Sequence, residues 1–441
     1  MKNFKLGKLW DSLHSSYWFI PTLMAAMAII LAVGMLTLDR HGYYGPIEKW
    51  GWIYTGGPDG ARAVLSAVAG SMISVTATAF SITIVALQLA ASNFGPRLLR
   101  NFMQDTGNQV VLGTFIATFI YSLLVLRVIH GEDYNIFVPQ ISVTVGIVLG
   151  IISIGVLIYF IHHASTIIQV SNVIAEVSAD LDRTIEQIFP KNFGQSEEED
   201  KRRVAEIPTN FESESCEIVA TDSGYLQGID NEKLMKIARK HNLLFRLKTR
   251  PGKFVIQGSI LLIVWHKDRL NKKLAKQIVD AFLLGKERNE QQDVEFPIEQ
   301  LVEIALRAMS PAVNDPFTAI RCIDRLSAGL SRLAQIDFPS PYRYDSDDNL
   351  RVIAEIVTFA ELTDAAFNQI RLYSTQDRAV TLRLLEAIAQ IAHHIRYPNY
   401  KVALRRHADM IFQDSREGIS QEQDQKDIYQ HYQAVIQALQ H

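Results

Sequence analysis

The sequence predicts an α-helical membrane domain with four transmembrane helices, followed by a cytoplasmic α+β part made of a small β-rich module and a mostly helical domain. The distribution of charge is the first observation behind this prediction. Residues 1–175 hold nine Lys or Arg and seven Asp or Glu, which leaves 35 and 40 of the chain's 44 and 47 for residues 176–441. The second observation is four uncharged stretches of spanning length, all within residues 1–175.

The four predicted spans cover residues 17–38, 63–96, 106–126 and 134–161. The second span is unusual, because all 34 of its residues are uncharged. As one helix it would run about 51 Å at 1.5 Å per residue. The hydrocarbon core of a bilayer is about 30 Å thick, so this helix must tilt, kink or protrude.

The loops predict the orientation of the spans. Positive residues gather before the first span and between the second and third: Lys2, Lys5, Lys8, Arg97 and Arg100. The positive-inside rule therefore places both termini in the cytoplasm and residues 39–62 outside. The predicted location is the bacterial inner membrane, which the chain crosses several times.

The second span carries a stripe of polar residues within "SMISVTATAFSITIVALQLAAS". Its seven members alternate three and four residues apart, which places them on one face of a helix: Ser71, Ser74, Thr78, Ser81, Val85, Gln88 and Ser92. Two interpretations fit. Small and hydroxyl residues let transmembrane helices pack closely, and Ala63, Ala67, Gly70 and the pair Gly146 and Gly150 suit that interpretation. The other interpretation is a wet surface that lines a permeation path, which the length of the stripe favours.

No carboxylate or amine lies inside a predicted span, which argues against a proton-coupled pump. A passive pore does not need such groups. Four helices enclose little space, so a pore would require several chains and the predicted partner is a second copy of the chain. Arg97 and Arg100 would lie at its inner mouth or bind lipid phosphates.

The residues after the spans predict a connection between the two parts. Gly95 and Pro96 should end the second span. The helix of the fourth span is predicted to continue unbroken out of the membrane. A helical extension and charged linker is predicted over 176–213. His162 and His163 are adjacent and point about 100° apart on a helix, so no metal site is expected there.

The soluble part is predicted as a β-rich module over 214–267 and a helical domain over 268–441. Strand patterns surround a turn at 222–224 and another at 250–253. From Asp268 onward the pattern is helical, with one long loop before a helix predicted over 350–372.

A corner motif, "RAMSPAVNDPFTAIRC", joins the first two helices of this domain. Asp315 before Pro316 is a strong N-cap signal, so local chemistry explains the motif as a rigid corner: Ser310, Pro311, Asn314, Asp315 and Pro316. The alternative is a functional site, because a helix N-terminus attracts anions.

Three stretches together resemble the recurring motifs of domain-of-unknown-function family 2254: "FSITIVALQLAASNFGPRLLRNFMQD", "FIHHAS" and "IALRAMSPAVNDPFTA". The resemblance implies a bacterial membrane protein with an N-terminal membrane part and a cytoplasmic C-terminal part. It implies no activity.

Two hypotheses for function follow from the sequence. The first is a homo-oligomeric channel or pore whose second span lines the path and whose cytoplasmic half assembles or gates it. The alternative is a non-conducting scaffold or sensor whose cytoplasmic half binds a ligand or partner. An enzyme is not expected, because no catalytic signature occurs, and neither a cofactor nor a metal is expected. The slightly acidic soluble part also makes a nucleic-acid partner unexpected.

Overall fold

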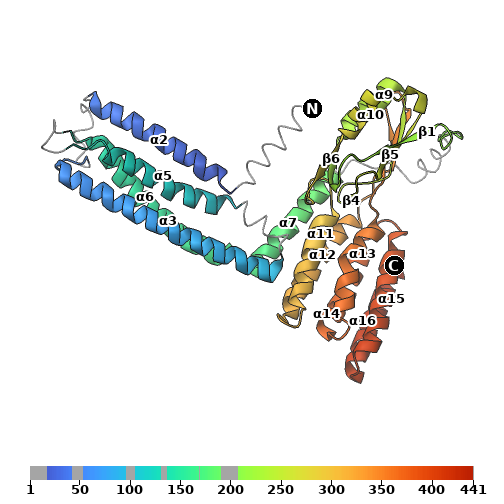
Figure 1. Ribbon diagram of the computed structural model, residues 1–441. Helices are drawn as coiled ribbons and strands as arrows, with labels where there is room; N and C mark the ends of the chain where they lie inside the picture. The colour runs from blue at the N-terminus through green and yellow to red at the C-terminus, as the bar shows by residue number, and fades with distance from the viewer. Residues whose placement is uncertain are drawn as a thin grey trace. The chain divides into compact units, whose positions relative to one another are not determined.

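The computed structural model describes residues 17–41, 53–95, 105–130, 137–167, 169–189 and 207–440. The chain forms two compact units, Met1–Val173 and Ile174–His441. The first contains long helices, and the second contains two small sheets and a set of helices (Figure 1). The predicted class, four apolar helices followed by an α+β part, is confirmed.

Four helices of the first unit are long and apolar enough to cross a membrane: α2 (Phe19–Arg40), α3 (Pro58–Phe94), α5 (Thr106–Leu126) and α6 (Gln140–Ile167). The most buried of them is α5, which packs against the other three. Its fully buried Tyr121 donates a hydrogen bond to the Ser142 carbonyl of α6 at 3.0 Å. Gly146 and Gly150 let α6 approach α3, because a Cβ at Gly146 would lie 2.6 Å from Leu65.

Two aspartates fix the ends of these helices. Asp39, at the end of α2, is 3% exposed and accepts from the backbone N–H groups of Ile141 and Ser142 at 3.0 and 2.9 Å. It therefore caps the N-terminus of α6 from a different helix. Asp105 caps α5 and accepts from His163 Nε2 at 2.7 Å. Among the described residues no group of His, Cys, Asp and Glu could hold a metal.

The prediction of an unbroken helix after the fourth span is wrong. The structure has two helices, since α6 ends at Ile167 and α7 (Val170–Ile188) begins three residues later. The Asn172 side chain donates to the Thr166 carbonyl at 2.8 Å and so occupies an acceptor that a continuous helix would use. α3 ends at Phe94, as predicted, because the next residue, Gly95, has a φ of 103° that does not continue a helix. Arg97 and Arg100 lie outside the described residues, as does most of the charged linker.

The second unit contains a five-stranded sheet of order β1-β5-β3-β8-β7 and a three-stranded sheet of order β4-β2-β6. The strands are β1 (Ser215–Val219), β2 (Gly224–Ile229), β3 (Leu244–Leu247), β4 (Phe254–Val255), β5 (Ile260–Trp265), β6 (Phe282–Gly285), β7 (Tyr342–Tyr344) and β8 (Leu350–Ile353). Helices α9 (Asn231–His241) and α10 (Lys272–Val279) contribute Leu234 and Ile278 to the same apolar core.

The prediction that the chain is helical from Asp268 onward is wrong at β6 and β8, and the loop predicted before residue 350 contains β7. β6 pairs with β2, and β8 pairs in parallel with β3. The predicted helix over 350–372 begins only at Phe359, since Leu350–Ile353 extends the sheet. Long-range strand pairing therefore decided these segments, because short apolar runs suit either structure.

The remaining helices pack as a layer beside the sheets (Figure 1). They are α11 (Glu295–Ala308), α12 (Pro316–Leu333), α13 (Phe359–Tyr373), α14 (Arg378–Ala392), α15 (Tyr400–Gly418) and α16 (Glu422–Gln440). Their facing sides bury leucine, isoleucine and phenylalanine at helical spacing, as Leu326, Leu330 and Leu333 do on α12.

Candidate functional site

The polar stripe of α3 faces away from the helices of its own unit. All seven of its members are exposed, and Val85 is 55% exposed. The buried row of α3 lies about 180° around the helix and consists mainly of small residues, such as Ala79, Thr83, Ala86 and Ala90. Ala63, Ala67 and Gly70 continue the stripe and are exposed as well. Within one chain, the stripe therefore packs against none of α2, α5 and α6.

Most hydroxyls of the stripe bond to their own helix. Ser71, Ser74, Thr78 and Ser81 each donate to the carbonyl four residues earlier, at 2.7 to 3.0 Å. Such bonds lower the energetic cost of placing a hydroxyl in an apolar medium. Gln88 differs, because its exposed side-chain amide has no hydrogen-bond partner among the described residues. An unpaired amide is costly in hydrocarbon, so water or a polar group outside the described residues would stabilise Gln88.

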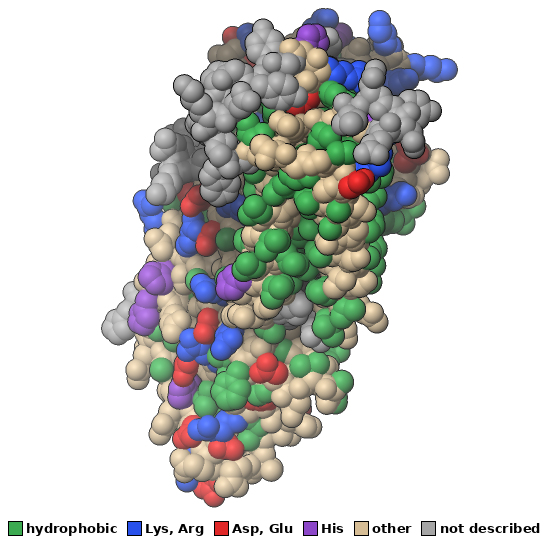
Figure 2. Space-filling model, turned by 90° about the vertical axis from the view of Figure 1, so that its left-hand side faces the viewer, with side chains coloured by type: hydrophobic (Ala, Val, Ile, Leu, Met, Phe, Trp, Pro, Cys, Tyr) green, Lys and Arg blue, Asp and Glu red, His purple; other side chains and the backbone are tan. Residues whose placement is uncertain are grey.

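The outward faces of α2 and α6 provide the contrast. Met27, Ile30 and Val33 on α2 are 55 to 72% exposed, and Ile151, Ile154 and Ile158 on α6 are 57 to 66% exposed. Such side chains suit lipid. Hydrophobic side chains gather over one stretch of the surface in Figure 2, whereas Lys, Arg, Asp and Glu are interspersed over another. α3 also exposes large apolar side chains, such as Ile73, Phe80 and Ile84, but the stripe differs from the outward faces of α2 and α6 in being mainly polar and made of small residues.

The corner motif forms a capped turn between α11 and α12. Asp315 accepts from the Thr318 backbone N–H at 3.2 Å and from its hydroxyl at 2.6 Å, and Pro316 is the first residue of α12. Asn314 has a positive φ of 50°, and its backbone N–H donates to the Ser310 carbonyl at 2.9 Å. These bonds occupy the polar groups of the turn with its own backbone.

Replacement of Asp315 by alanine is expected to lower the free energy of unfolding by about 1 kcal/mol, the usual effect of a lost N-cap. Thermal unfolding of the purified full chain measures the change, and Asp315→Asn, which retains a capping oxygen, is the matched control. An unchanged melting temperature together with a lost activity would instead identify the corner as a functional site.

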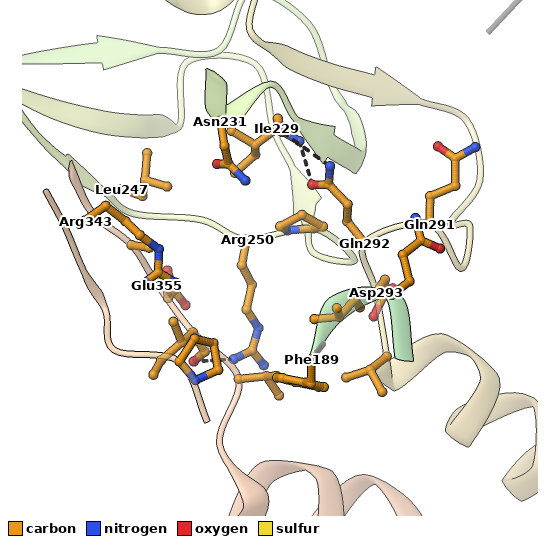
Figure 3. A pocket seen from close by; sticks show the side chains of 18 of the residues that line it. Phe189, Ile229, Asn231, Leu247, Arg250, Gln291, Gln292, Asp293, Arg343 and Glu355 are labelled. Atoms are coloured by element: carbon orange, nitrogen blue, oxygen red, sulfur yellow. Dashed lines mark hydrogen bonds between the residues drawn. The ribbon is translucent and has the colours of Figure 1, made fainter. Parts of the chain in front are cut away.

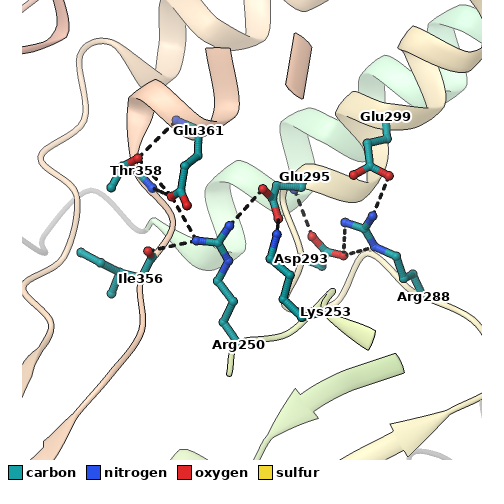
Figure 4. A network of polar contacts seen from close by, with 9 residues as sticks. All are labelled: Arg250, Lys253, Arg288, Asp293, Glu295, Glu299, Ile356, Thr358 and Glu361. Atoms are coloured by element: carbon teal, nitrogen blue, oxygen red, sulfur yellow. Dashed lines mark hydrogen bonds and ion pairs between the residues drawn. The ribbon is translucent and has the colours of Figure 1, made fainter. Parts of the chain in front are cut away.

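A buried polar network joins the sheets of the second unit to its helices (Figure 4). Arg250 has a side chain only 7% exposed. It donates to Glu295 Oε1 at 3.0 Å, and to Glu361 Oε2 and the Ile356 carbonyl at 3.1 Å each. Burial opposes the charge on Arg250, but the hydrogen bond that it donates to Glu361 and the charges of both glutamates raise its pKa above the ordinary value. Lys253 completes the pairing with Glu295 at 3.3 Å.

The other half of the network centres on Asp293, whose side chain is 3% exposed. Arg288 donates to its Oδ2 at 2.7 Å and to Glu299 Oε2 at 2.6 Å. The turn after β3 lies directly above it, since a Cβ at Gly252, which has φ 93°, would be 2.4 Å from Asp293 Oδ2. Burial raises the pKa of Asp293 to about 6, although Arg288 acts in the opposite direction.

Asp293 should make the protein more stable as the pH falls toward 4. Its folded-state pKa lies above the ordinary value of 3.8, so the folded state holds a proton that the unfolded state releases between about pH 4 and pH 6. The stability that protonated Asp293 contributes is therefore fully present below the unfolded-state pKa and is lost as the pH rises through the folded-state pKa of about 6. Melting of wild type and Asp293→Asn at pH 4.5 and 7 measures this. The melting temperature of the wild type relative to Asp293→Asn should be higher at pH 4.5 than at pH 7. The difference between the wild type and the exposed control Glu232→Gln should be the same at both pH values.

A cavity of about 450 Å³ lies beside this network (Figure 3). Its lining comes from the end of α7, the start of α9, the turn after β3, residues 291–295 and the segment that follows β8. Arg250 lies between two groups of polar side chains, with Asn231, Arg343 and Glu355 on one side and Gln291, Gln292 and Asp293 on the other. Arg250 Nε is buried without a hydrogen-bond partner. The cavity is large enough for a small organic molecule.

No pattern in the sequence identifies the residues of this network and cavity. The residues at 250–253 predict a turn, but nothing local indicates that Arg250 is buried. Such a site is assembled from segments more than 100 residues apart, as the bond between Arg250 and Glu361 illustrates. Tertiary structure alone brings these residues together.

A family model described as "Predicted membrane protein" matches residues 14–390. The chain belongs to this family, DUF2254. An uncharacterised protein of Mycobacterium bovis and another of Mycobacterium tuberculosis are each 32% identical to it over 420 residues, or 94% of this chain and 79% of each relative. No solved structure matches the chain. This DUF2254 protein is therefore a predicted membrane protein with four apolar helices, which would contact the lipid bilayer.

Proposed function

We propose that this DUF2254 protein is a homo-oligomeric channel or pore of the bacterial inner membrane. In this proposal α3 lines the path with Ser71, Ser74, Thr78, Ser81, Val85, Gln88 and Ser92, and the second unit lies in the cytoplasm and assembles or gates the pore. The observation that carries the proposal is the direction of the stripe. A polar face that turns away from its own bundle needs water or further protein chains to cover it.

Small residues on the same face support assembly through α3. Gly70 has no atom within 4 Å of a Cβ built on it, so a larger side chain fits within one chain. A close helix–helix contact between copies would not tolerate that side chain. Gly34 on α2 and Gly155 on α6 have the same open surroundings and lie on outward faces. These three positions therefore form a matched set.

The test compares Gly70→Leu with Gly34→Leu and Gly155→Leu. The mass of the protein in detergent and ion flux through liposomes are measured for each variant. We expect a multimer that conducts for the wild type and for both controls, and a dissociated, non-conducting chain for Gly70→Leu. A wild-type protein that is monomeric in detergent and produces no flux would contradict the proposal.

The topology of the proposal has both termini in the cytoplasm and residues 39–62 outside. The positive-inside rule supports this orientation, and Arg97 and Arg100 would then lie at the inner mouth or on lipid phosphates. We expect Trp50→Cys to react with an impermeant thiol reagent added to intact cells, and Arg100→Cys to react only after lysis. The reverse pattern would contradict the orientation.

A second candidate function, a membrane sensor, is favoured by the cavity beside Arg250. Its volume and mixed lining suit a small polar organic molecule, and it contacts the end of α7, the helix that follows the last span. Native mass spectrometry of the full chain tests this. A small molecule should co-purify with the wild type and be lost from Ala354→Phe, which fills the cavity. Absence of any co-purified molecule would favour the channel alone.

A further inference from the structure

The corner between α11 and α12 exposes an apolar tip. Phe317 is 73% exposed and Val313 is 50% exposed, and Pro311 and Ala312 beside them are also exposed. The backbone of the turn is held rigidly by the Asp315 cap and the bonds to Ser310. A rigid turn that presents several adjacent apolar side chains to solvent marks a contact surface.

Two arginines follow the tip on the same face of α12. Arg321 and Arg325 come four and eight residues after Phe317, so all three lie along one side of the helix. Both arginines are exposed, and neither has an acidic partner among the described residues. The nearby acids are engaged elsewhere, since Asp315 caps α12 and Asp324 pairs with Arg383. The face therefore combines an apolar tip with positive charge one turn, about 6 Å, behind it.

Contacts within the second unit show which end of α7 the tip lies beside. Leu181 packs where a Cβ at Gly329 would lie, Asp182 and Glu186 pair with Arg332, and Phe189 contacts Phe338. Residue numbers rise together in the two helices, so α7 and α12 run parallel. From Arg332 back to Pro316 is about 24 Å, and from Glu186 back to Val170 is also about 24 Å. The corner is therefore level with the start of α7.

The start of α7 is the point at which the chain leaves its last apolar helix. α6 ends at Ile167 and α7 begins at Val170. With 28 residues, α6 is about 42 Å long, which matches a bilayer core together with its headgroup regions. The corner therefore lies beside the end of α7 that follows this span directly in the chain, and this short connection keeps it within reach of the bilayer surface.

We propose that the α11–α12 corner docks on the surface of the membrane that the four spans cross. Phe317 and Val313 enter the boundary between headgroups and acyl chains, while Arg321, with Arg325 behind it, faces the phosphates of anionic lipids. The four spans keep the second unit close to the bilayer, so even a weak contact is populated. This inference requires membrane insertion of the spans and is independent of whether the protein conducts ions.

The test uses the full chain in nanodiscs with tryptophan reporters. Val402 is the matched control, because it is 72% exposed and lies on α15 near Tyr400, which bonds to Ile336 beyond the opposite end of α12. Lipids brominated near the headgroup should quench the added fluorescence of Phe317→Trp about twofold, since an interfacial side chain enters the bilayer by about 5–10 Å. They should leave that of Val402→Trp unchanged.

The arginines are tested by lipid composition. Quenching of Phe317→Trp should be stronger with phosphatidylglycerol than with phosphatidylcholine alone, and this difference should vanish when Arg321 and Arg325 are both changed to glutamine. Each arginine should raise the ratio of membrane-docked to undocked corners about fivefold on the anionic lipid. Equal quenching of both reporters, or a shifted but unquenched Phe317→Trp spectrum, would overturn the proposal. The second outcome would identify a protein surface as the partner.

Discussion

Replacement of Val85 by serine is expected to raise ion flux through reconstituted liposomes about tenfold. Val85 is the single apolar member of the α3 stripe, one turn from Ser81 and Gln88. In a ring of chains it repeats at one level, and water leaves a narrow apolar neck without a physical plug. A tenfold change corresponds to about 1.4 kcal/mol, which is of the order of the transfer free energy of a valine side chain.

The structure makes this substitution a clean test. Val85 is 55% exposed and does not pack against α5 or α6, so the change leaves the core of the chain intact. A serine at this position can bond to the carbonyl four residues earlier, as Ser81 does at 2.9 Å. Ile84→Ser is the matched control, because Ile84 is 48% exposed at the same depth but points about 100° away from Val85.

The comparison of the two serine variants decides the role of Val85. Ile84→Ser should conduct like the wild type. Equal flux from the wild type and Val85→Ser, with the assembly intact, would show that Val85 does not gate a pore.

Replacement of Arg250 by methionine is expected to destabilise the second unit by about 3–5 kcal/mol. The change leaves Glu295, which is 10% exposed at its side chain, with Lys253 as its remaining partner and removes a bond to Glu361. Breaking a buried ion pair from one side is costly because the buried charge that remains loses its closest partner. Burial raises the pKa of Glu361, but the bonds from Arg250 and Thr358 lower it below the ordinary value, and loss of Arg250 weakens that effect.

Arg239→Met provides the control for this prediction. Arg239 pairs with Asp347 at 3.3 Å, and the two side chains are 55% and 63% exposed. An exposed pair contributes only about 0–1 kcal/mol, so this variant should melt close to the wild type. Chemical unfolding of the full chain in detergent measures both variants. Similar losses from both would mean that the buried network does not hold the sheets to the helices.

The sequence alone determined the apolar helices of the membrane part and much of the local structure. Long uncharged stretches specify membrane helices, because the bilayer excludes charge over about 30 Å. The end of α3 at Phe94 follows from Gly95 and Pro96, and the start of α12 follows from Asp315 and Pro316. These features depend on neighbouring residues, so a local pattern contains them.

Tertiary structure decided which faces are covered. The spacing of Ser71 to Ser92 specified one face of a helix, but both packing and pore lining suited it. Only the folded bundle places Ala79 and Ala90 inside and the stripe outside. Small and polar residues suit both packed and exposed faces of a membrane helix, so which face is buried depends on the helices that pack beside it.

Long-range pairing decided the second unit. Leu350–Ile353 became a strand because β3, about 105 residues earlier, offers it a free edge, as the pairing of Phe245 with Val352 shows. Arg250 became a buried centre because Glu295 and Glu361 approach it from two different helices. Residues that meet only after the chain has folded leave no local signal, since each of them would look like an ordinary surface charge in its own segment.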